Sequence, residues 1–104
     1  MSEHPGIVFR PGPTGRRAGL VGGPDVWEVV RAVKSARASE PDLPEANLLG
    51  LLAENTGILV RLIRVAVRYW ASYPDETDAE LAAAVIAEAA AEDAWRRERR
   101  LLAG

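Results

Sequence analysis

The sequence contains no cysteine, which excludes a disulfide framework and a zinc site built from thiolates. It contains one histidine, His4, so a histidine-activated nucleophile or a histidine metal cluster cannot be assembled within one chain. We expect His4, so close to the N-terminus, to be incidental. No apolar run approaches the roughly 18 residues that suggest a membrane span. These absences predict a soluble, cytoplasmic protein without a cofactor or a contact with the membrane.

The chain is short, and its charge is unevenly distributed. Its 104 residues, 48% of them hydrophobic, suffice for one small domain with appendages, and a core of that size favours a partner subunit. The net charge is −2. Residues 1–71 hold nine Lys and Arg against seven Asp and Glu, whereas residues 72–104 hold four against eight. Residues 1–71 are therefore net basic and residues 72–104 net acidic, and we expect the two parts to have different electrostatic roles.

Residues 1–23 contain too much glycine and proline for a helix, and we interpret them as an N-terminal arm or hairpin. Within them, "IVF" and "LV" are the candidates for two short strands joined by a loop.

Residues 24–74 show helical spacing and predict a three-helix, helix-turn-helix-like core. A first helix is expected over about 25–37, opened by a capping box of Asp25 and Glu28. Asp42 and Glu45 repeat that signature before a second helix, which Gly57 ends in the left-handed conformation. The third helix covers 58–73. Residues 75–104 form a tail with a long alanine-rich helix over 76–102, so the fold class is mainly α. An apolar stripe begins on this helix with Leu81, Val85, Ile86 and Ala89, but acids interrupt it, so we expect the helix to leave the domain.

Four acids stand together at the start of this last helix: Asp75, Glu76, Asp78 and Glu80. They resemble a carboxylate cluster for a metal. Negative charge is also what a helix dipole favours in the first turn, and this explains the cluster without a metal. Paired acids that transfer protons need a pocket, which the sequence does not indicate. We therefore expect no catalytic residues and no enzyme.

Three arginines, Arg61, Arg64 and Arg68, fall within a stripe about 60° wide on the third helix. A short apolar helix, a turn with glycine and a second helix with a basic face are typical of a helix-turn-helix that inserts its second helix into the major groove. Arginine can bond guanine edges or hold phosphates there. The alternative is an ordinary solvated helix face. The stripe contains no acid, which favours an external anion.

Arg16 and Arg17 lie in the glycine-rich arm and are further candidates for DNA binding, through a phosphate backbone or a minor groove. The alternative is that they keep a loop soluble.

The last helix ends in "AWRRERRLLAG", which places aromatic and aliphatic side chains beside arginines. The alternative is a basic, frayed helix end. Tryptophan and arginine are enriched where proteins bind one another. We therefore expect residues from about 87 to 102 to bind a partner through Trp95, Arg96, Arg97, Arg99, Arg100, Leu101 and Leu102.

Residues 45–82 resemble a known family. The family's pattern is a helix that ends in aromatic residues and is followed by a proline and acids. In this chain the corresponding residues are Tyr69, Trp70, Tyr73, Pro74, Asp75, Glu76, Thr77 and Asp78. The stretch is similar to VapB-type antitoxins of the group described as a helix-turn-helix-like domain of unknown function. The resemblance implies a DNA-binding dimer that represses its own operon and neutralises a toxin, commonly a PIN-domain ribonuclease, through its C-terminal tail.

Two hypotheses therefore stand. The first is an antitoxin of a type II toxin-antitoxin system that binds operator DNA as a homodimer. The second is a small helical adaptor or subunit that binds proteins and never touches DNA. For the dimer, we expect a surface shared between copies through the strand residues Ile7, Val8, Phe9, Leu20 and Val21.

Overall fold

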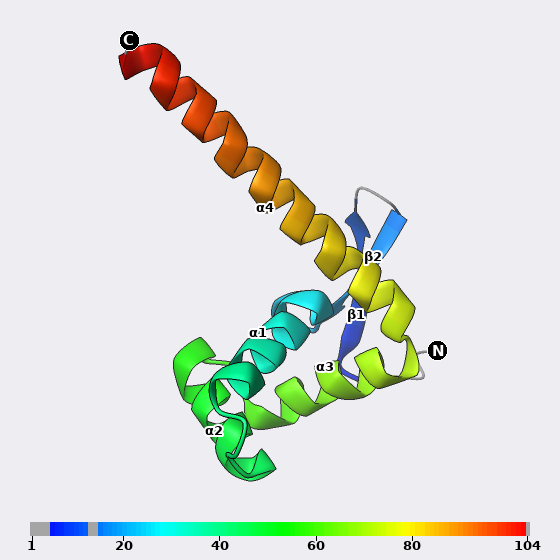
Figure 1. Cartoon of the computed structure of the whole chain (residues 1–104). Coiled ribbons are helices and arrows are strands. Elements are labelled where there is room, and N and C mark those ends of the chain that lie inside the picture. The colour runs from blue at the N-terminus through cyan, green and yellow to red at the C-terminus, as the bar shows by residue number, and fades with distance from the viewer. Residues whose placement is uncertain (1–4, 13–14, 104) are drawn as a thin grey trace.

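The computed structural model describes residues 5–12 and 15–103. A two-stranded antiparallel hairpin precedes four helices, the last of which extends far beyond the rest of the chain (Figure 1). The elements are β1 Ile7–Gly12, β2 Gly15–Leu20, α1 Val26–Ser39, α2 Glu45–Thr56, α3 Val60–Ser72 and α4 Pro74–Ala103. The expected fold class is confirmed: the chain is mainly helical, with short N-terminal strands and a long C-terminal helix.

The hairpin is longer than the sequence predicted. The expected strands covered only "IVF" and "LV", with a loop between them, but β1 and β2 pair through most of that loop. Arg10 lies directly opposite Arg17 in the register, and both approach the carboxylate of Asp25. One buried acid thus compensates two cations that would otherwise repel each other across the strands. A Cβ at Gly19 would overlap the Arg10 guanidinium, so a larger residue there would displace this side chain from Asp25 and from the Leu20 carbonyl.

Helix α1 begins as predicted. Asp25 is its N-cap, and its backbone N–H donates to Glu28 Oε1 at 3.2 Å, which completes the expected capping box.

The start of α2 was predicted wrongly. Asp42 does not cap this helix, because Pro44 occupies the N-cap position and the first helical residue is Glu45. A proline disfavours helical conformation in the residue before it, so the helix cannot extend back through Leu43. The end of α2 was predicted correctly: Gly57 is left-handed, with φ of 75°, and donates to the Ala53 carbonyl.

One hydrophobic core joins the hairpin to α1, α2 and α3. Its buried members are Ile7, Ala18, Leu20, Val26, Val29, Val30, Leu49, Leu52, Ile63, Ala66 and Tyr69. Ile7 and Leu20 were expected on a surface shared between copies, and that expectation is wrong, since the domain's own helices cover them. Phe9 and Val21 do remain exposed, whereas Val8 is half-buried.

Helix α4 packs on the domain only through its first turns. It begins at Pro74, two residues earlier than predicted, because proline is tolerated at the first position of a helix. Thr77 is buried and Leu81 is half-buried against the core, and Glu88 reaches Arg31 of α1. Every described residue from Val85 onward is exposed. The expected apolar stripe through Val85 and Ile86 therefore faces solvent, and the helix leaves the domain as predicted (Figure 1).

Among the described residues, no helix has both the length and the hydropathy that a bilayer crossing requires.

Candidate functional site

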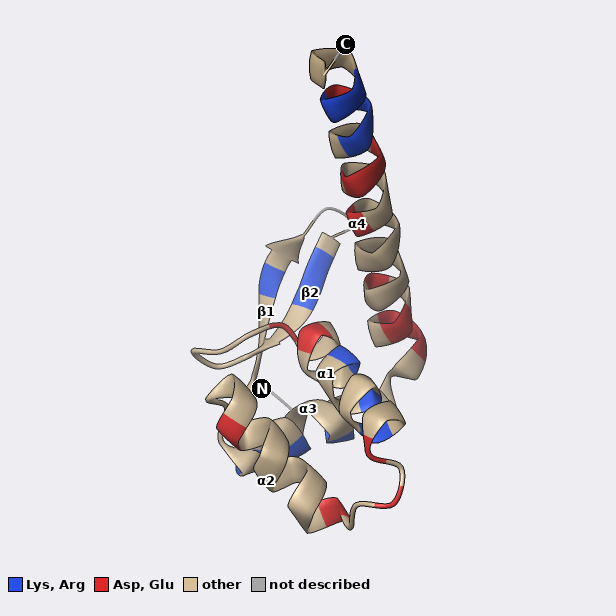
Figure 2. Cartoon of the chain, turned by 60° about the vertical axis from the view of Figure 1, so that its left-hand side comes forward, with Lys and Arg blue, Asp and Glu red and all other residues tan. Residues whose placement is uncertain are grey.

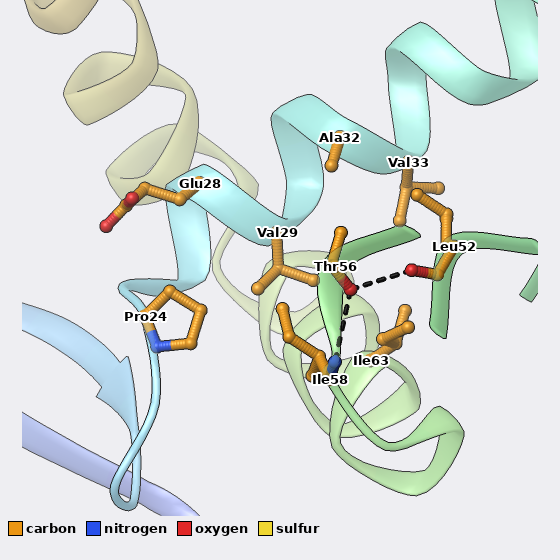
Figure 3. Close-up of a pocket in the computed structure, with 9 residues that line it drawn as sticks. All are labelled: Pro24, Glu28, Val29, Ala32, Val33, Leu52, Thr56, Ile58 and Ile63. Carbon is orange, nitrogen blue, oxygen red and sulfur yellow. Dashed lines mark hydrogen bonds between the residues drawn. The ribbon is translucent and has the colours of Figure 1, made fainter. Parts of the chain in front are cut away.

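Helices α2 and α3 form a helix-turn-helix arrangement with a well-defined turn. The Thr56 hydroxyl donates to the Leu52 carbonyl at 2.7 Å and accepts from the Ile58 backbone N–H at 3.2 Å (Figure 3). The same side chain thus closes α2 and fixes the direction in which the chain enters α3. Together with left-handed Gly57, these bonds set the angle between the two helices.

A cavity of about 400 Å³ lies against this turn, where α1, α2 and α3 meet. Its walls are mostly apolar, including Val29, Leu52 and Ile63 (Figure 3). Its carboxylate, from Glu28, already accepts a hydrogen bond in the α1 cap. The cavity is therefore a mostly apolar gap behind the turn, and its one carboxylate is engaged in the helix cap.

The three arginines of α3 are exposed on the face opposite the core contacts of Ile63 and Ala66. Arg64 Nη1 lies 2.9 Å from Glu45 Oε2 on α2. Within the described part of the chain, Arg61 and Arg68 form no ion pair. The absence of an acid on α3 itself did not reveal the Glu45 contact, because that acid comes from the neighbouring helix.

The basic surface continues onto α1, which the sequence analysis did not identify. Lys34 and Arg37 line an open groove of about 790 Å³ between α1, α2 and α3, and Arg64 and Arg68 line its other side. Lys34 Nζ lies 3.5 Å from Asp78 Oδ1, and Arg37 donates to the Leu43 carbonyl at 2.6 Å. The i, i+3 spacing of Lys34 and Arg37, which places both on one face of α1, could have revealed this part of the basic surface from the sequence.

The two arginines of the arm have different environments. Arg17 Nε lies 2.6 Å from Asp25 Oδ2, and its Nη1 donates to the Pro11 carbonyl at 2.6 Å. Arg16 is exposed, and its guanidinium lies 4.0 Å from the centre of the Phe9 ring. Arg17 is therefore committed to holding the hairpin, whereas Arg16 presents its charge to solvent.

The acids at the base of α4 face α3 and the hairpin. The Tyr69 hydroxyl donates to both oxygens of Glu76, at 3.1 and 3.2 Å. Burial and the adjacent Glu76 raise the pKa of Tyr69 to about 12. Burial, with Glu76 and Asp25 nearby, also raises the pKa of Glu80, although Arg17 opposes this. In residues 5–12 and 15–103, no three acids or histidines are arranged to hold a metal ion.

The free end of α4 exposes large apolar side chains. The exposed fractions of Trp95, Leu101 and Leu102 are 59%, 81% and 73%. The Arg99 guanidinium lies 5.9 Å from the Trp95 ring centre. Arg96 pairs with Glu92 and Asp93 of its own helix, while Arg97 and Arg100 form no ion pair with any described residue.

Comparison of the chain with protein-family models, with curated proteins and with solved structures found no match.

Proposed function

We propose that this chain is the antitoxin of a type II toxin-antitoxin system. In this proposal it acts in the cytoplasm as a homodimer that binds operator DNA, represses its own transcription and neutralises a ribonuclease toxin through its C-terminal tail. The support from the sequence is the resemblance of residues 45–82 to VapB-type antitoxins. The support from the fold is the separation of a basic helix-turn-helix from a projecting helix.

The observation that carries the proposal is the exposure of Trp95, Leu101 and Leu102 on a helix that has left its domain. Large apolar side chains in water are unfavourable by roughly 25 cal/mol per Å² of surface, so a free helix with such an end favours a partner. None of the three contributes to the domain's own core. Their role is therefore intermolecular.

Arginines surround these anchors and indicate the chemistry of the partner. Metal-dependent ribonucleases hold Mg²⁺ through clustered carboxylates. Arg97 and Arg100 are available to pair with such acids and to displace the metal or its phosphate substrate. A PIN-domain ribonuclease is the class that the family resemblance implies.

The DNA-binding part of the proposal rests on α3. Arg61 and Arg68 lie about two turns apart on one helix face with Arg64 between them, and neither forms an ion pair with any described residue. Arg16 on the hairpin and Lys34 on α1 are additional cations for phosphate contacts. Arg17 is less suited to this role, because Asp25 already neutralises it.

Two sets of variants test the two activities separately. Arg61→Ala with Arg64→Ala and Arg68→Ala should abolish binding to the chain's own upstream region in a gel shift and leave neutralisation of the co-expressed toxin intact. Trp95→Ala with Leu102→Ala should abolish neutralisation of the toxin and leave DNA binding intact. If the unaltered chain binds its partner but no upstream DNA at any salt concentration, the protein is an adaptor, and the repressor function is excluded.

A further inference from the structure

One face of α4 runs from the domain, where Glu76 and Glu80 are half-buried, to the free end of the helix, where it is exposed. Its positions are spaced alternately by four and three residues, which keeps them on a single stripe of a helix. The members of this alanine face are Glu76, Glu80, Ala83, Ala87, Ala90, Ala94, Arg97 and Leu101. The four alanines are exposed. The stripe lies about a third of a turn from Trp95 and Leu102.

The basic residues of α4 lie at its free end, whereas its acids extend from the base through Glu88, Glu92 and Asp93 to Glu98. Four acids lie within residues 75–80 at its base, and four arginines with one glutamate lie within residues 96–100 at its free end. Figure 2 shows the basic residues of α4 in blue at its free end and acids in red at intervals from its base up to those basic residues. Twenty helical residues separate these groups by about 30 Å, so they cannot meet within one rigid helix.

A second copy running antiparallel brings the opposite charges together. When Ala87 of one copy lies beside Ala90 of the other, Ala83 lies beside Ala94 and Glu80 beside Arg97. Glu76 then lies beside Leu101. The same register therefore pairs every member of the alanine face, and it does so reciprocally, as a closed two-fold interface requires.

We propose that two copies of this chain associate through antiparallel α4 helices along the alanine face, with Glu80 of each copy paired to Arg97 of the other. The alanines allow the two backbones to approach closely but do not by themselves select a partner. The charges at the two ends make that selection, since they favour the antiparallel orientation and a second copy of this chain.

The base of α4 has room for the end of the second helix. A hollow of about 470 Å³ lies on the alanine face between α4 and the hairpin, and it is lined by Arg16, Glu76, Ala79, Glu80 and Ala83. Burial and the neighbouring Glu76 and Asp25 raise the pKa of Glu80, and Arg17 offsets this only in part. Arg97 of a second copy would provide further positive charge, and the exposed Leu101 would fill the apolar part of the hollow.

This interface uses Arg97 and Leu101 of the free end, which are also candidates for the toxin contact, and leaves Trp95, Arg100 and Leu102 to that contact. Trp95 and Leu102 point away from the alanine face, and the arginines of α3 lie on another helix. The dimer does not depend on the proposed function, and it is tested with the isolated chain, without toxin or DNA. If the variants fail these tests while the native chain is still a dimer, this interface is ruled out and the homodimer of the proposed function must use another surface. A monomeric native chain would contradict both this interface and that homodimer.

Cysteine cross-linking tests the register, because the native chain has no cysteine. Ala83→Cys and Ala94→Cys chains of different mass are mixed and mildly oxidised. The control mixes Val85→Cys with Glu92→Cys, which share the register but lie on the opposite side of the helix. We expect the first mixture to form a heterodisulfide at least about tenfold faster than the control. Equal rates, or rapid self-linking of Ala83→Cys alone, would overturn the proposal.

Exchanging the charges gives a second test. Glu80→Arg and Arg97→Glu should each raise the dimer dissociation constant by about tenfold or more, since two pairs become repulsive in each dimer. An equimolar mixture of the two variants restores both pairs and should restore the dimer in analytical ultracentrifugation. Circular dichroism verifies that each variant is folded. A native chain that is monomeric at micromolar concentration, or a mixture that stays monomeric, contradicts the proposal.

Discussion

Arg17 Nε lies 2.6 Å from Oδ2 of Asp25, and this ion pair fastens the hairpin to the start of α1. The other carboxylate oxygen of Asp25 lies 3.2 Å from Arg10 Nη1. Asp25 is 8% exposed and is also the N-cap of α1. A single side chain thus separates two opposed arginines and begins a helix, so its removal affects both elements.

Asp25→Ala should lower the free energy of unfolding by about 2–4 kcal/mol, because it removes a helix cap and leaves two part-buried cations facing each other. Chemical denaturation measures this. Asp75→Ala is the control, since Asp75 is exposed in the first turn of α4, and its effect should stay within about 0.5 kcal/mol. Equal losses in the two variants would show that Asp25 does not hold the hairpin.

Glu45 restrains the central arginine of the candidate DNA-binding face. Its Oε2 lies 2.9 Å from Arg64 Nη1, in a pair that is largely exposed. If α3 contacts phosphates, Glu45→Gln should strengthen operator binding, because it frees Arg64 and removes a negative charge near the DNA. The plot of log affinity against log salt should steepen by about 0.9 for one added phosphate contact.

Glu54→Gln is the matched control for this experiment. Glu54 is an exposed acid on the same helix and forms no ion pair with any described residue. It should change affinity less and leave the salt slope unaltered. If both substitutions act equally, only the net charge matters, and Arg64 is not a contact residue.

The Tyr69–Glu76 hydrogen bond makes stability sensitive to high pH. The pKa of Tyr69 is raised from its ordinary 10.0 to about 12, because the phenolate would be buried beside a carboxylate. Between these values the folded chain binds more protons than the unfolded chain, so the free energy of unfolding falls as pH rises. The loss should reach about 2 kcal/mol by pH 12.

Denaturation of Tyr69→Phe over the same pH range isolates this effect from other titrating groups. The variant should lose less stability than the parent between the two pKa values, although it starts lower because it lacks the hydrogen bond to Glu76. Parallel curves for the two proteins would mean that Tyr69 does not titrate as inferred.

Local signals in the sequence identified most of the helices. The capping box of Asp25 and Glu28 and the left-handed Gly57 each depend on residues within a few positions, and both were predicted correctly. Asp42 carried the same local signature, but Pro44 overrode it. A cap motif therefore predicts a helix start only when no proline follows within the first turn.

Contacts between distant segments could not be predicted from local patterns. Arg17 was interpreted as a free cation because Asp25 lies eight residues away, beyond a strand and a turn. Arg64 was interpreted as unpaired because Glu45 lies on another helix. The exposure of the last helix was predicted from the acids that interrupt its apolar stripe. In the structure, Thr77 and Leu81 dock this helix, whereas Val85 and Ile86 of the expected stripe are exposed.

The last prediction concerns Trp95, whose side chain is 59% exposed and lies beside Arg99 of its own helix. Trp95→Ala should leave the free energy of unfolding of the isolated chain nearly unchanged. It should weaken toxin binding by about 2 kcal/mol or more if Trp95 anchors the partner, which isothermal titration calorimetry with the co-produced toxin measures.

Ile86→Ala is the control, because Ile86 is apolar and 69% exposed on the opposite side of the same helix. If Ile86→Ala weakens binding equally, the partner contacts α4 without preference for the Trp95 side. If Trp95→Ala instead destabilises the free chain, the tryptophan supports the fold, and the tail does not bind in the proposed way.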